Sequence, residues 1–243
     1  MNKRSVFLVL AAGAVFFFTG CASSNFSFTE MSPVAVSGVE GSPSVFLVDE
    51  NYITDEDAGG AISNTVNKLL YADDPEIYSA QDRLDFAEQY LRQALETIAD
   101  VKTVSKEEIV NNKTYKQNVS PFSYTNTNVV ASGYKKNSLT FGRKTARKIM
   151  SETGAGSLVS LYFEFDKKFT QKPDGKYVSA VIKMRANIMN QNGKLVVFDN
   201  FIEESSQSVK CYSGAHYEKE EFIQLYPEII ENAINRFVLE YVR

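Results

Sequence analysis

The stretch Val178-Ser-Ala-Val-Ile-Lys-Met-Arg-Ala-Asn-Ile188 decides the fold, because apolar and polar side chains alternate along most of it. Alternation places every second side chain on one face, which is typical of a strand with one buried face. Asn192-Gly193 follows where a tight turn is needed, and the apolar-rich residues 195–202 can return as the partner strand. The sequence therefore predicts a β-hairpin with one face that helices must cover.

The rest of the chain supplies further strands and the covering helices. Strands are predicted at residues 33–41, 44–52, 101–104 and 157–169, and helices at 58–71, 79–98, 140–153 and 218–242. Gly154 is expected to end the third helix, and Pro227 to lie in the first turn of the main part of the last one. We therefore predict one α+β domain over residues 33–243: a single mixed or antiparallel sheet with a C-terminal β-hairpin, packed against several helices.

The helix at 79–98 has the clearest pattern. Ser79 to Asp82 has the form of a capping box, and an apolar stripe follows at steps of three and four residues. Core packing is the favoured interpretation of that stripe, and a partner-binding helix is the alternative. The charged residues between are expected on the solvent side: Arg83, Glu88, Arg92 and Glu96.

Residues 111–138 break the regular pattern. The segment is rich in Asn, Ser, Thr and Lys, with Pro121 and Gly133 as breakers. Tyrosine among small polar residues is typical of binding loops. The expected partner-binding residues are Tyr115, Phe122, Tyr124 and Tyr134. A surface excursion that is pinned to the domain by its aromatic rings is the equally weighted alternative.

The beginning of the chain predicts where the protein works. Lys3 and Arg4 precede an apolar run over residues 6–18, which is too short to span a bilayer and is typical of a signal peptide. The run ends in Phe18-Thr19-Gly20-Cys21, which resembles a relaxed, spirochaete-like lipobox of bacterial lipoproteins. That resemblance implies a signal peptide over residues 1–20, a diacylated Cys21 and a tether over residues 21–32. A plain signal peptide or a short core helix with an accidental cysteine is the alternative.

Composition and motifs argue against several classes of function. The chain has 26 Lys and Arg against 30 Asp and Glu, and this mild acidity argues against nucleic-acid binding. Acylation of Cys21 would leave Cys211 as the only other cysteine, so the fold cannot depend on an internal disulfide. Common hydrolase, nucleotide and zinc-protease motifs are missing, and His216 is expected at the surface or a helix entry. We therefore expect no enzyme, no metal and no cofactor beyond the lipid groups on Cys21.

The order of elements resembles a periplasmic α/β fold found in three bacterial groups. These are the curli-secretion lipoprotein, the amino-terminal domain of the Tol system's propeller protein, and the lipoprotein activators of penicillin-binding proteins. The similar residues are 91–109 and Thr153-Gly-Ala-Gly-Ser-Leu-Val159, while Ser105 and Gly156 depart from the families' pattern. The resemblance implies a protein that binds other proteins or assembles.

Two functional hypotheses follow. The first is a non-catalytic binding or assembly lipoprotein of the cell envelope, anchored at the periplasmic face of the outer membrane and contacting an envelope protein or a second copy. The second is a membrane-active or lipid-binding lipoprotein that uses amphipathic helices and a basic cluster against anionic head groups. That cluster is Arg143, Lys144, Arg147 and Lys148. The alternative for the cluster is a solvated helix face that compensates the dipole at the helix C-terminus.

Overall fold

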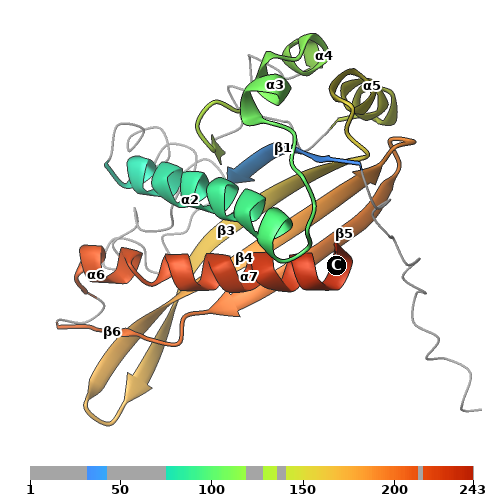
Figure 1. Ribbon diagram of the computed structural model, residues 1–243. Coiled ribbons are helices and arrows are strands. Elements are labelled where there is room, and N and C mark those ends of the chain that lie inside the picture. Colours follow the sequence, from blue (N-terminus) through green and yellow to red (C-terminus); the bar gives the residue numbers. More distant parts are fainter. Residues whose placement is uncertain (1–31, 43–74, 119–127, 136–140, 213–215, 243) are drawn as a thin grey trace, which may run out of the picture.

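The computed structural model describes residues 32–42, 75–118, 128–135, 141–212 and 216–242. Figure 1 shows a sheet with helices packed over it. The elements in chain order are β1 (Val34–Gly41), α2 (Pro75–Thr97), α3 (Lys106–Asn111), α4 (Lys113–Asn118), β2 (Val129–Val130), α5 (Arg143–Thr153), β3 (Ser157–Lys172), β4 (Gly175–Asn190), β5 (Leu195–Glu204), β6 (Val209–Lys210), α6 (Lys219–Ile223) and α7 (Tyr226–Tyr241). The strand and helix expected at residues 44–52 and 58–71 lie outside the described residues.

The described strands form one mixed sheet in the order β2-β1-β3-β4-β5, with β6 paired to β4. The pair β1 and β3 is parallel, and the other pairs are antiparallel. The predicted hairpin is confirmed, because β4 pairs with β5 and Gly193 takes the left-handed φ of 68° that its turn requires. The α+β class is likewise confirmed. The stretch 101–104 contributes only an isolated bridge, between Thr103 and Val34.

The helices α2 and α7 cover one face of the sheet (Figure 1). On β4 this face carries the alternating residues Val178, Ala180, Ile182, Met184, Ala186 and Ile188, all fully buried. Phe201 of β5 meets Phe237 of α7 edge to face, with ring centroids 6.1 Å apart. The β3–β4 hairpin continues past these helices and ends in a tip at residues 173–174 (Figure 1).

The structure corrects two expectations about α2. The helix begins at Pro75, so Ser79 lies inside it and is not the cap; proline suits the first helical position because its missing N–H has no intrahelical partner there. Arg83 and Glu88 are buried, 4% and 6% exposed, and not on a solvent face. The Arg83 guanidinium carbon lies 4.6 Å from the ring centroid of Phe165 and 4.7 Å from that of Tyr226. Aromatic rings of the sheet and of α7 therefore enclose a cation that the helical pattern alone assigns to water.

Candidate functional site

The tyrosines expected to contact a partner are buried. Tyr115 on α4 is 0% exposed and packs edge to face against Phe141, and its hydroxyl accepts a hydrogen bond from the Lys135 N–H at 3.3 Å. Tyr134 is 5% exposed. The expectation that these two rings contact a partner is wrong, because both rings pack inside the domain. Phe122 and Tyr124 lie outside the described residues.

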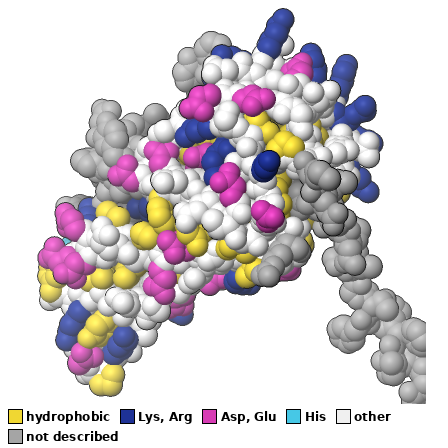
Figure 2. All heavy atoms as spheres, in the orientation of Figure 1, with side chains coloured by type: hydrophobic (Ala, Val, Ile, Leu, Met, Phe, Trp, Pro, Cys, Tyr) yellow, Lys and Arg dark blue, Asp and Glu magenta, His cyan; other side chains and the backbone are white. Residues whose placement is uncertain are grey.

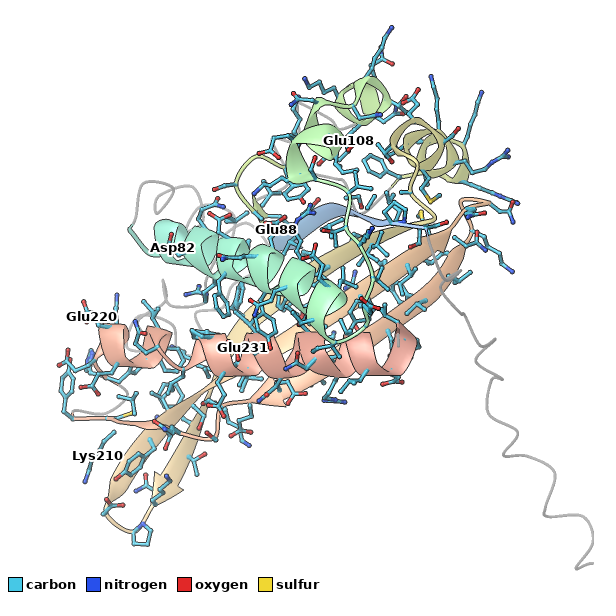
Figure 3. The ribbon with its side chains drawn as sticks, viewed as in Figure 1. Asp82, Glu88, Glu108, Lys210, Glu220 and Glu231 are labelled. Atoms are coloured by element: carbon cyan, nitrogen blue, oxygen red, sulfur yellow. The ribbon has the colours of Figure 1, made fainter. Side chains whose placement is uncertain are left out.

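Tyr134 is part of a buried polar network on α2. Its hydroxyl donates to Glu88 Oε1 at 2.9 Å and accepts from Arg92 Nη2 at 2.8 Å. Arg92 also donates to Glu88 at 2.5 Å and to the Val104 carbonyl at 2.7 Å, and Lys106 Nζ lies 3.6 Å from Glu88. Figure 3 shows Glu88 on the side of α2 that faces α3. Burial raises the pKa of Tyr134, so the hydroxyl stays protonated. Its hydrogen bonds to Glu88 and Arg92 fix the residues around Tyr134 on α2.

The helix α5 presents its cations to solvent. It begins after Gly142 and ends at Gly154, whose φ of 67° confirms the predicted helix end. Its apolar side packs inward through Ala146, Ile149 and Met150, and the exposed cations are Arg143, Lys144, Arg147 and Lys148. None of them lies in the last turn, and the first turn holds no acidic residue. Compensation of the C-terminal dipole is therefore wrong as an explanation, since cations near an N-terminus oppose the dipole.

Two neighbouring elements enlarge this basic surface. Helix α4 packs against α5 and exposes Lys113 and Lys116, and the β4–β5 turn exposes Lys194. We call the whole set the basic end: Lys113, Lys116, Arg143, Lys144, Arg147, Lys148 and Lys194. Figure 2 shows dark blue side chains projecting from this part of the molecule. Lys148 lies 3.8 Å from Glu152, which also accepts a hydrogen bond from Asn112 Nδ2 at 3.0 Å.

The β4–β5 turn is fixed against α5. Arg143 Nε donates to the Asn192 carbonyl at 2.9 Å. A Cβ on residue 193 would lie 2.2 Å from the Arg143 carbonyl oxygen, so only glycine allows this approach. The cations of α5 and of the turn therefore form one rigid surface.

The chain enters the domain at the same end of the sheet. Val34, the first residue of β1, pairs with Ser157, which in turn pairs with Asn190 just before the turn. The Gly156 N–H, two residues past the end cap of α5, donates to the Pro33 carbonyl at 2.9 Å. The first described residues of the domain therefore lie at the α5 end of the sheet.

The sheet face opposite α2 and α7 holds a second candidate surface, across β3, β4 and β5. We call it the open face and define it by Tyr162, Glu164, Lys183, Arg185, Phe198 and Ile202. The Arg185 guanidinium carbon lies 5.3 Å from the Tyr162 ring centroid and 5.6 Å from that of Phe198. Glu164 lies 3.8 Å from both Lys183 and Arg185. Phe198 and Ile202 are 59% and 63% exposed and lie on the same face of β5, with only Asn200 between them on that face.

The hairpin tip forms the opposite end of the molecule and is also rich in lysine. Its cations are engaged locally: Lys172 lies 4.2 Å from the Tyr177 ring centroid, and Lys176 the same distance from that of Phe169. Lys210 pairs with Asp174 at 3.3 Å, and Lys168 pairs with Glu204 at 2.6 Å. Figure 3 shows Lys210 beside the hairpin, far from α5. The hairpin lysines are thus matched by rings and carboxylates.

The structure also describes the metal-ligating side chains, His216 and the lengths of the helices. Within the described ranges, no group of three or more His, Cys, Asp or Glu side chains could hold a metal ion. His216 stacks on Tyr212 with ring centroids 6.3 Å apart, near the half-buried Cys211. Among the helices that the structure describes, none is long and apolar enough to cross a membrane. Cys21 and its tether lie outside the described residues.

Sequence reasoning found four cations of the basic end and missed the rest of both surfaces. Lys113, Lys116 and Lys194 join α5 only through tertiary packing. A local signal for Phe198 and Ile202 does exist, because β5 carries apolar residues on both faces, Val197 and Phe201 inward and these two outward.

Comparison with known proteins assigns no family. No family model and no curated protein matches the chain. Protein XCC0632 from Xanthomonas campestris, described under DUF330, is a solved structure with 10% identity, a TM-score of 0.22 and coverage of 39% of this chain and 55% of its own. The hypothetical protein CT253 from Chlamydia trachomatis has 12% identity, a TM-score of 0.31 and coverage of 84% and 98%. Both similarities are too low to carry an argument about function.

Proposed function

We propose that this chain is a lipid-anchored protein of the bacterial cell envelope whose domain is a non-catalytic binding module. The lipobox-like Phe18-Thr19-Gly20-Cys21 supports the anchor. The observation that carries the binding role is the exposure of Phe198 and Ile202 on β5. Exposed apolar side chains beside aromatic and arginine side chains are typical of the centres of protein interfaces.

The strand β5 also offers backbone groups to a partner. It ends the described sheet, and among the described strands it pairs only with β4. An unpaired strand edge accepts an extended segment as an added strand, with main-chain hydrogen bonds for affinity and side-chain contacts for specificity. The proposed occupant is therefore an extended segment of an envelope protein, with apolar side chains at alternate positions that meet Phe198 and Ile202.

A second copy of this chain fits β5 less well. Two copies of β5 can pair antiparallel about Asn200, with Phe198 of each opposite Ile202 of the other. Such a pair has a two-fold axis perpendicular to the sheet. The axis reverses the strand direction, so Val34 of one copy and Val34 of the other lie at opposite ends of the joined sheet. Two domains tethered to one membrane by short leashes cannot both adopt that arrangement easily, so a different protein is the better occupant.

The test is photo-crosslinking in native envelopes. A photoreactive residue at Asn200 should crosslink to a defined peptide segment of one envelope protein, identified by mass spectrometry. The double variant Phe198→Ser with Ile202→Ser should lose that crosslink. The matched control is Leu239→Ser, because Leu239 is 50% exposed but lies on α7, which covers the opposite face of the sheet from Phe198 and Ile202. Equal crosslinking in the double variant, or loss of the crosslink in the Leu239→Ser control, would refute the binding surface.

The anchor has its own test. Cys21→Ser removes the only acceptor for a thioether lipid at the lipobox-like site, so the variant should move from the membrane fraction to the soluble fraction. Two acyl chains anchor a protein stably in a membrane, whereas a protein without an acyl chain has no such anchor. The shift to the soluble fraction should therefore be nearly complete. Full membrane retention of the Cys21→Ser variant contradicts acylation as the anchor.

A further inference from the structure

We propose that the basic end docks on the anionic head groups of the membrane that holds the anchor, and so orients the tethered domain with α5 toward the lipid and the β3–β4 hairpin away from it. The inference rests on the proposed lipid anchor at Cys21 and adds the orientation of the domain.

The distribution of charge on α5 is the first argument. Arg143 and Lys144 occupy the first turn, where a positive charge opposes the helix dipole. Folding of α5 alone therefore gains nothing from these cations. Anionic head groups gain from them, because each Lys or Arg brought to an anionic surface strengthens binding about fivefold.

The position of the chain entry is the second, independent argument. Pro33 and Val34 lie at the end of the sheet that carries α5 and the β4–β5 turn. Cys21 precedes Pro33 by twelve residues, which span at most about 40 Å when fully extended. The tether thus brings the basic end to the membrane at high effective concentration, whereas the hairpin tip is the part farthest from it.

Rigidity of the basic end is the third argument. Gly193 and the hydrogen bond from Arg143 to Asn192 fix the turn on α5, and α4 packs on the other side. Cations held on one surface reach the head groups together, within the roughly 8 Å over which charge acts at physiological salt. The lysines at the hairpin tip are instead engaged by rings and carboxylates, as with Lys168 and Glu204.

The orientation can be measured by energy transfer to the membrane. A chain that starts at Cys21 contains every described residue, and coupling of Cys21 to a maleimide lipid in a Cys211→Ser background replaces the native anchor. A fluorescent amino acid is placed at Gln117, exposed on α4, or at Asp174, exposed at the hairpin tip. Acceptor lipids are added to vesicles of neutral phosphatidylcholine, or of phosphatidylcholine with 30% phosphatidylglycerol.

We expect stronger energy transfer from position 117 than from position 174 on the anionic vesicles, and a smaller difference on the neutral vesicles or in 1 M salt. Replacement of Lys113, Lys144 and Arg147 by Gln should lower the ratio of docked to undocked domain about a hundredfold, from about fivefold for each cation. The matched control replaces Lys168, Lys172 and Lys176 by Gln at the opposite end and should leave the ratio unchanged. Circular dichroism checks that both triple variants fold.

Equal transfer from the two positions on anionic vesicles would overturn the proposal, as would a triple Gln variant of the basic end that docks like the parent. Because the maleimide lipid supplies the anchor, failure here is distinct from failure of native acylation, which the Cys21→Ser fractionation reports. Docking that is equally strong on neutral vesicles would also overturn it, since the contact would then not be with anionic head groups. Energy transfer that does not depend on phosphatidylglycerol would count against the proposal, because an acidic protein and not lipid would then be the better partner for the basic end.

Discussion

Replacement of Glu88 by Gln should strongly lower the free energy of unfolding. The Glu88 side chain is 8% exposed and faces Arg92, Lys106 and the Tyr134 hydroxyl. Removal of one member of a buried ion pair costs about 3–5 kcal/mol, because the remaining charge loses its partner. The Arg92 side chain is 16% exposed and keeps the Val104 carbonyl, so we expect a value near the lower limit, about 3 kcal/mol.

The companion variant Tyr134→Phe should cost less. It removes two hydrogen bonds to charged groups, each worth about 1.5–3 kcal/mol, but Glu88 and Arg92 keep each other, so the loss should be about 2 kcal/mol. Because the two side chains share one network, the double variant should lose about 1 kcal/mol less than the sum of the single variants.

Urea denaturation of the chain without residues 1–21, followed by circular dichroism, measures all three changes. Glu96→Gln is the matched control on the same helix: Glu96 is exposed, and an exposed substitution should change the free energy of unfolding by less than about 0.5 kcal/mol. A Glu88→Gln variant as stable as the control, or strict additivity with Tyr134→Phe, would refute the role given to the network.

Three further predictions concern the turn, the two faces of β5 and alkaline pH. Gly193→Ala should lower the free energy of unfolding by about 2–3 kcal/mol in a urea titration, because φ is 68° and the new Cβ meets the Arg143 backbone. Phe201→Ala should cost about 3–5 kcal/mol, whereas Phe198→Ala, on the open face, should cost less than about 1 kcal/mol; equal losses would contradict the assignment of the faces. Burial raises the pKa of Tyr226 above its value of about 10 in the unfolded chain. The contribution of Tyr226 to the free energy of unfolding is therefore complete below pH 10 and is lost as the pH rises further. The Tyr226→Phe variant should therefore lose less stability between pH 9 and 11.5 than the parent, as thermal melts can show.

The parts of the fold that sequence predicts best are those set by local pattern. The alternation over residues 178–188, with Asn192-Gly193 after it, predicts β4, its turn and β5, because each signal lies within a few residues of the structure it specifies. Gly154 predicts the end of α5 for the same reason. The partners of β1 are different: β1 pairs with β3 more than one hundred residues later, and nothing local encodes that choice.

The candidate sites were harder to predict because burial is decided by distant segments. Charge and helical spacing place Glu88 on a solvent face, but Tyr134, 46 residues later, covers it. Tyr115 has the composition of a binding loop around it, yet Phe141 and the domain enclose its ring. Conversely, the basic cluster on α5 is visible in the sequence because all four cations lie within six residues, and its extension to Lys194 depends on the packing of the turn.

The parallel pairing of β1 with β3 also has a consequence for the order of folding. The antiparallel strands β3, β4 and β5 are joined by short turns, so they can pair while the rest of the chain is still unfolded. β1 must wait for a loop of more than one hundred residues to close before it can add to the β3 edge. Exposed β3 backbone during that interval is a site for intermolecular pairing. Loss of β1 should therefore leave the β3 edge exposed and increase aggregation, while the β3–β5 meander still forms early.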